Sequence, residues 1–140
     1  MFSFHHVSLN VSDLDKTKQF YAMLGFESVL EWVSPSHDLS IVHLKLGDAF
    51  VELFCYKENK FPPTNLSQSQ LGLQHFALKV ESIDLAKKAI VQAGLVSAED
   101  LEVIVGRTGI IYFFLKDPDG NLIEIVEDKR SFIKPTLLNP

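Results

Sequence analysis

The sequence predicts an α+β fold of two tandem βαβββ modules, and three observations indicate it. The first is an internal repeat, in which HHVSLNVSDLDKTKQFYAMLGF (residues 5–26) returns as QHFALKVESIDLAKKAIVQAGL (residues 74–95). The second is that each copy reads as an alternating strand, a capped helix and a glycine stop. The third is that both copies continue with short apolar segments between Gly, Asp and Pro turns, which are typical of paired strands. A fixed offset across all these elements indicates duplication.

The repeat also aligns polar residues. The offset is 69 residues over the first strand, the helix and the third strand, and three extra residues in the turn at 116–120 then raise it to 72. The matched pairs include His6 with His75, Gly25 with Gly94, Leu44 with Phe113, and Glu52 with Glu124. Each copy therefore begins its first strand with histidine and carries glutamate in its last strand.

The elements of the first module follow from alternation and capping. Residues 4–11 alternate as a strand, with His5 and His6 on opposite faces. Ser12 is expected to cap a helix over 13–24 and to form a capping box with Asp15, and Gly25 ends that helix. Further strands are expected over 26–33, 39–46 and 49–56.

The second module is expected to follow the same plan. It begins with a strand over 75–80 and a helix over 83–93, which Ser82 caps. The Asp-Pro-Asp-Gly sequence at 117–120 is a strong turn between its last two strands. The chain is therefore interpreted as one domain over 1–140: module 1 over 4–56, a linker over 57–71, module 2 over 72–127 and a tail over 128–140.

Composition narrows the function classes. The 140 residues carry a formal net charge of −5 without a Lys/Arg cluster, so nucleic acid is not an expected partner. The single cysteine, Cys55, suits the cytoplasm, and the N-terminal segment lacks a signal-peptide pattern. No apolar run reaches the length of a membrane span, so no membrane association is expected.

The repeated histidines and glutamates point to a metal. Glu52 shares its strand face with Phe50 and Phe54, and a buried carboxylate is costly unless it is paired, protonated or bound to a metal. One such Glu alone is more often a solvent-facing edge residue, and one His alone a core or surface residue. Together, His6, Glu52, His75 and Glu124 form a donor set of two nitrogens and two oxygens for one divalent ion, which could be zinc, nickel, cobalt, manganese or iron.

The other histidines are not included in this site. His5 is interpreted as packing on the opposite face of its strand. His37 and His43 have no histidine at the repeated position, so neither is assigned a role.

These residues give the chain a resemblance to the vicinal oxygen chelate superfamily, in particular its glyoxalase I (lactoylglutathione lyase) branch. The resemblance covers residues 4–127. The motifs that carry it are HHVSLNVSDLDKTKQFY, LGF, VELF, GLQHFALKV and FFLKDPDGNLIEIVE. It implies the glyoxalase/bleomycin resistance/dioxygenase fold, with curled mixed sheets around a metal held by His6, Glu52, His75 and Glu124. It also implies a homodimer, in which the site lies within one chain or is shared by two.

The resemblance further implies a mechanism. The metal would hold two neighbouring oxygens of a small substrate derived from a 2-oxoaldehyde and stabilise an enediolate, and Glu124 would be the catalytic base. The positions at which glyoxalase I uses an arginine and an asparagine for glutathione hold Asn10 and Tyr56, which predicts weak use of glutathione.

Two alternatives from other classes stay open. One is a metalloenzyme of the same superfamily with another small substrate: an acyl-CoA epimerase, an extradiol dioxygenase or a fosfomycin-type transferase. The other is a metal-free drug-binding protein of the bleomycin-resistance kind. The presence of all four ligand types counts against the dioxygenase, the transferase and the drug-binding protein, and it leaves the epimerase open.

Overall fold

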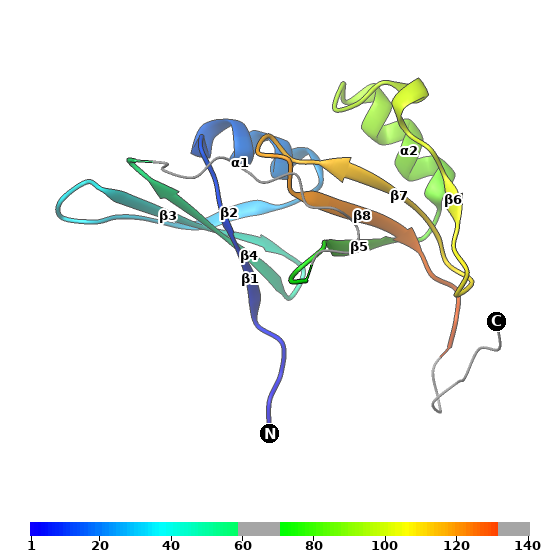
Figure 1. The fold of residues 1–140 in the computed structure, drawn as a ribbon, viewed down its shortest axis with the longest axis horizontal. Helices are drawn as coiled ribbons and strands as arrows, with labels where there is room; N and C mark the ends of the chain where they lie inside the picture. Colours follow the sequence, from blue (N-terminus) through cyan, green and yellow to red (C-terminus); the bar gives the residue numbers. More distant parts are fainter. Residues whose placement is uncertain (59–70, 132–140) are drawn as a thin grey trace. The chain divides into compact units, whose positions relative to one another are not determined.

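The computed structural model describes residues 1–58 and 71–131, which form two compact units (Figure 1). The first unit contains the first four strands, the first helix and the turn Asp117–Gly120. The second contains the last four strands, the second helix and a short 3-10 helix, Ala98–Asp100. Each unit has the predicted βαβββ order. The expected linker and tail lie largely outside the described residues.

The first unit is a four-stranded mixed sheet with one helix. Its strands are β1 (His6–Asn10), β2 (Glu27–Val33), β3 (Leu39–Leu46) and β4 (Ala49–Tyr56), and its helix is α1 (Leu14–Met23). The strand order is β1-β4-β3-β2. β1 and β4 run parallel, whereas β3 is antiparallel to both of its neighbours. β4 is therefore flanked on both sides, which matters for the residue at its centre.

The second unit repeats this topology. Its strands are β5 (Phe76–Val80), β6 (Ile104–Val105), β7 (Ile111–Lys116) and β8 (Leu122–Glu127), and its helix is α2 (Ile83–Gln92). The strand order is β5-β8-β7-β6, with β5 parallel to β8 and β7 antiparallel to its neighbours. The predicted fold class is confirmed: each module is a mixed sheet with the same connectivity.

Each sheet buries one face in its own core. In β4, Val51 and Leu53 are buried, and in β8 so are Ile123 and Ile125. Successive strand residues point to opposite faces, so the glutamate between each pair points to the other face. The helices contribute their own buried residues to these cores: Phe20 and Tyr21 from α1, and Ile83 and Ile90 from α2.

The strand registers correct the predicted alignment of the third strands. Leu44 lies opposite Val51 in the first unit, and Leu115 lies opposite Ile123 in the second. The counterpart of Leu44 is therefore Leu115, not Phe113 as predicted. Two of the three extra residues thus precede β7, and one lies in the following turn. A shift of two residues keeps every side chain on its face, so the apolar pattern does not reveal the error.

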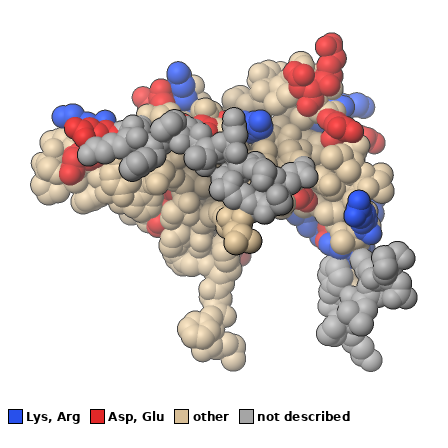
Figure 2. Space-filling view, viewed as in Figure 1, with Lys and Arg blue, Asp and Glu red and all other residues tan. Residues whose placement is uncertain are grey.

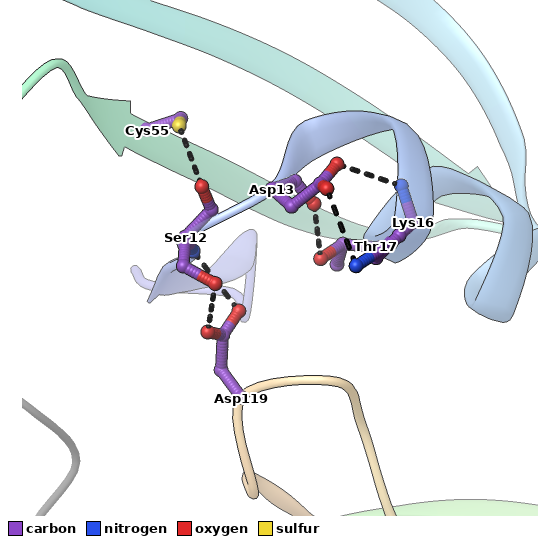
Figure 3. A network of polar contacts seen from close by, with 6 residues as sticks. All are labelled: Ser12, Asp13, Lys16, Thr17, Cys55 and Asp119. Atoms are coloured by element: carbon purple, nitrogen blue, oxygen red, sulfur yellow. Dashed lines mark hydrogen bonds and ion pairs between the residues drawn. The ribbon is translucent and has the colours of Figure 1, made fainter.

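The start of α1 also differs from the prediction (Figure 3). Asp13, not Ser12, is the N-cap, since its carboxylate accepts the Lys16 N–H at 3.0 Å. The hydroxyl of Thr17 donates to the backbone carbonyl of Asp13 at 2.8 Å. Ser12 instead donates its N–H to the carboxylate of Asp119 at 3.0 Å, and its hydroxyl donates to the same carboxylate. The predicted capping box is wrong because Asp119 occupies both donor groups of Ser12.

The other helix ends agree with the sequence. Ser82 caps α2, since its hydroxyl accepts the Leu85 N–H at 3.3 Å. Gly25 and Gly94 follow the two helices with φ angles of 96° and 72°. These angles lie in the left-handed region that glycine adopts without a steric penalty, so each helix stops there.

Two observations concern the surface. Among the described residues, no helix is long and apolar enough to cross a membrane. On the face shown in Figure 2, the Lys and Arg side chains of the described residues occur in small groups beside Asp and Glu, and neither sign covers a broad area.

Candidate metal centre

In the first unit, Glu52 lies at the centre of β4 and meets three polar side chains. Nε2 of His6 is 3.2 Å from Oε2 of Glu52, and the Ser8 hydroxyl donates to the same oxygen at 3.3 Å. Nε2 of His43 is 3.0 Å from the other oxygen, Oε1. The register explains this convergence, because Ser8 on β1 and His43 on β3 both lie directly opposite Glu52. The Glu52 side chain is 14% exposed.

In the second unit, Glu124 holds the same place on β8. Nε2 of His75, just before β5, lies 2.8 Å from Oε2 of Glu124. The residues opposite Glu124 are Ala77 on β5 and Phe114 on β7. The Phe114 ring meets the His75 ring edge to face at 5.2 Å between centroids. Glu124 is buried, with 7% of its surface exposed.

In both His6 and His75, the ring nitrogen that faces away from the glutamate, Nδ1, contacts the preceding residue. Nδ1 of His75 lies 3.1 Å from the amide oxygen of Gln74, which is an acceptor, so the proton belongs on Nδ1. Nδ1 of His6 lies 2.8 Å from Nδ1 of His5, and His5 can accept in the same way. When the proton is on Nδ1 in both histidines, each Nε2 has its lone pair directed at a glutamate. Metal-binding histidines use this pattern, in which a hydrogen bond at one nitrogen orients the other.

The distances suit a bound cation. A lone pair on Nε2 and a carboxylate oxygen repel each other at 2.8 Å or 3.2 Å unless a proton or a metal ion is present. Two donors at right angles around an ion at about 2.1 Å lie about 3 Å apart. Within residues 1–58 and 71–131, no group of three or more His, Cys, Asp or Glu is arranged to hold a metal ion. In each unit, the histidine nitrogen and the glutamate oxygen are therefore spaced as two ligands of one divalent ion would be.

Two histidines differ from the prediction. His5 is predicted on the face opposite His6, but its ring stacks on Phe50 at 5.6 Å, on the face of Glu52. The reason is that β1 begins at His6, so strand alternation does not extend to His5. The predicted site does not include His43, yet His43 contacts Glu52. The sequence carries a signal for this contact: the two-residue turn Gly47-Asp48 between β3 and β4 puts His43 opposite Glu52.

The positions tied to glutathione are at the surface. Asn10 is exposed at the end of β1, and Tyr56 is 45% exposed at the end of β4.

Comparison with known proteins decides the family. The model of the Glyoxalase/Bleomycin resistance protein/Dioxygenase superfamily matches residues 3–125. The chain belongs to this superfamily. The resemblance read from the motifs is thereby confirmed, and the repeated topology of the two units agrees with it.

Relatives within the glyoxalase superfamily have different activities in their names. The chain is 30% identical over 126 residues to the mitochondrial methylmalonyl-CoA epimerase of Mus musculus, covering 86% of this chain and 70% of the relative. It is 29% identical over 133 residues to the probable lactoylglutathione lyase of Vibrio parahaemolyticus, covering 90% of this chain and 91% of the relative. The crystal structure of a glyoxalase family protein from Enterococcus faecalis matches with a TM-score of 0.75 and 34% identity, over 89% of this chain and 97% of that one.

Proposed function

We propose that this protein is a divalent-metal-dependent lyase or isomerase of glyoxalase type. Its substrate would be a small hemithioacetal, formed by a thiol and a 2-oxoaldehyde. The observation that carries the proposal is the repeated His–Glu pair, in which the residue before each histidine contacts Nδ1 of that histidine. The ligands are His6, Glu52, His75 and Glu124, contributed by one chain or by two.

The donor set supports a divalent ion of the zinc, nickel, cobalt, manganese or iron group. Two imidazoles and two carboxylates leave two positions of an octahedral ion for substrate or water. When bound, the ion would act as a Lewis acid that stabilises the negative charge of an enediolate. His6 and His75 would hold it through Nε2, and Glu52 through Oε2.

Glu124 is the proposed base. Its carboxylate would take the proton from the carbon that bears the sulfur and return it to the neighbouring carbon, while the hydroxyl proton passes to the neighbouring oxygen, so that the hemithioacetal becomes a thioester of a 2-hydroxy acid. The buried position of Glu124 supports this role, because a carboxylate in a site with little water meets the substrate carbon with few competing solvent molecules.

The thiol part of the substrate is proposed to be something other than glutathione. Asn10 and Tyr56 are neutral, so neither can pair with a glutathione carboxylate as an arginine does. The lyase is therefore expected to use glutathione weakly and to accept other thiols.

A second candidate is an epimerase of acyl-CoA thioesters. It is favoured by the similarity to methylmalonyl-CoA epimerase over 126 residues. The chemistry differs in one respect: the proton leaves the carbon next to the thioester carbonyl and a proton returns to the same carbon from the opposite side. Glu124 would again move the proton.

We further propose that the protein is located in the cytoplasm and forms a homodimer. Support for the dimer comes from β2, the outer strand of the first sheet, in which every residue is exposed. Four of these are large apolar residues: Val29, Leu30, Trp32 and Val33. A second copy would cover such an edge.

Exchange of the substrate C–H proton with solvent tests the proposal. This measurement detects proton removal even when the product of the reaction is not identified. The protein, loaded with nickel or zinc, is incubated in D2O with methylglyoxal and each of several thiols, and separately with methylmalonyl-CoA. Proton NMR then follows loss of the substrate C–H signal. We expect exchange with one substrate class, and a loss of about 10²–10⁴-fold in Glu124→Gln with the fold retained. Full exchange in Glu124→Gln would remove Glu124 from the role of base.

A further inference from the structure

The two glutamates of the repeat have different neighbours in their own strand rows. In the first unit the row across three strands is Ser8, Glu52 and His43. In the second unit the equivalent row is Ala77, Glu124 and Phe114. The duplicated topology thus holds the glutamate constant and changes both residues beside it, from hydrogen-bond donors to apolar side chains.

This difference changes how each carboxylate is held. Both oxygens of Glu52 are engaged: Oε1 by Nε2 of His43 at 3.0 Å, and Oε2 by the Ser8 hydroxyl at 3.3 Å and by His6. Within the described part of the chain, Glu124 has a single polar side-chain partner, His75 at 2.8 Å. The Glu52 rotamer is therefore held by polar contacts to both carboxylate oxygens, whereas the Glu124 rotamer is held by a polar contact to one oxygen.

We propose that His43 and Ser8 are positioning residues that keep Glu52 a fixed metal ligand, and that their loss in the second unit frees Glu124 to turn and carry a proton. This inference rests on the proposed function, which it deepens by explaining why two equivalent glutamates have different roles.

The physical basis is the number of bonds that must break before a carboxylate can rotate. When the His43 N–H donates to Oε1, the lone pairs of Oε2 stay aimed at the position beside His6 Nε2. Hydrogen bonds of this kind orient a ligand, and their removal typically lowers metal affinity by about 10–100-fold.

Metal affinity of the whole protein tests the first half of the proposal. Calorimetric titration with Co²⁺ would be done on the wild type, on His43→Phe, which copies the second unit, and on His43→Gln, which keeps an N–H donor. We expect His43→Phe to bind about 10–100-fold more weakly. We expect His43→Gln to retain affinity within about threefold of the wild type, with the visible Co²⁺ spectrum preserved. A role in packing alone would be served by the Phe ring as well as by Gln, so a loss confined to His43→Phe points to the N–H donor.

The reverse variant tests the second half. Phe114→His gives Glu124 a donor on the equivalent strand position, so proton exchange should fall at least tenfold while Co²⁺ affinity is kept or increased. Unchanged exchange in Phe114→His, or Co²⁺ affinity in His43→Phe equal to that of the wild type, would overturn the proposal. Failure of the proposed function looks different, since the wild type itself would then bind no Co²⁺ or would show no proton exchange with any of the substrates.

Discussion

The imidazoles of His6 and His75 each have one nitrogen committed to the preceding residue and one aimed at a glutamate. In a protein without metal, a proton can occupy the space between nitrogen and carboxylate. The proposed divalent ion would displace that proton and take the nitrogen and the oxygen as ligands. Metal binding should therefore depend on each histidine separately, since a strand ligand has no nearby substitute.

A pair of histidine variants tests this dependence. His75→Ala should lose metal affinity and proton exchange together. His37→Asn is the matched control, because it also removes one imidazole and Asn tolerates the positive φ of 56° at this turn position. Metal content after gel filtration, with circular dichroism as the fold check, gives the answer. Equal metal content in the two variants would contradict the assignment of His75.

The sequence is sufficient to select four residues of the candidate site but not the residues around them. His6, Glu52, His75 and Glu124 are visible because a repeat that preserves polar residues at fixed positions is rarely accidental. His43 escapes a search that requires a histidine at the repeated position, because the second unit has Phe114 there. Ser8 lies two residues after His6 and shares its strand face, but its contact with Glu52 depends on which strands are neighbours.

Among the elements, the turn Asp117–Gly120 connects β7 to β8 and belongs to the first unit. The hydroxyl of the buried Tyr21 donates to the Asp117 carboxylate at 3.1 Å. Burial raises the pKa of Tyr21 well above its ordinary value, and the negative charge of Asp117 raises it further. The neutral phenol is thus strongly favoured in the folded protein.

This contact predicts a loss of stability at alkaline pH. A free tyrosine has a pKa of about 10, so above this pH the unfolded chain releases the Tyr21 proton and the folded protein does not. The stability from this group is complete below about pH 10 and falls at higher pH by up to about 1.4 kcal/mol per pH unit. Tyr21→Phe should cost about 1–3 kcal/mol at pH 8.

Urea unfolding at several pH values checks this expectation. The difference in free energy of unfolding between wild type and Tyr21→Phe should shrink as the pH rises from about 9 to about 11, on either side of the pKa of free tyrosine. A difference that stays constant over this range would show that the Tyr21 phenol is not protected from ionisation.

Element boundaries can be predicted closely, and the errors have local causes. The expected helices over 13–24 and 83–93 are observed as Leu14–Met23 and Ile83–Gln92. The predicted cap of α1 is wrong because Ser12 and Asp13 are both good N-cap residues, and the competing partner, Asp119, is distant in sequence. The predicted offset of the third strand is wrong because a slip of two residues leaves the same side chains buried.

At the scale of the whole molecule, the duplication and the family can be predicted from sequence, since both depend on patterns that extend over nearly the whole chain. The partner of β2 cannot be predicted from sequence, because an edge strand shows which residues are exposed without showing what covers them. The register of β2 also shifts between Ser28 and Leu30, an irregularity that locally bends the strand.

The most direct test of the central claim is anomalous diffraction from crystals grown with Ni²⁺ or Zn²⁺, recorded at the absorption edge of the metal. We predict one ion per site, about 2.0–2.2 Å from Nε2 of His6, Nε2 of His75 and one oxygen each of Glu52 and Glu124. The same map would show whether these four ligands come from one chain or from two. An anomalous peak bound by other residues, or no peak at these four side chains in protein saturated with metal, would contradict the account.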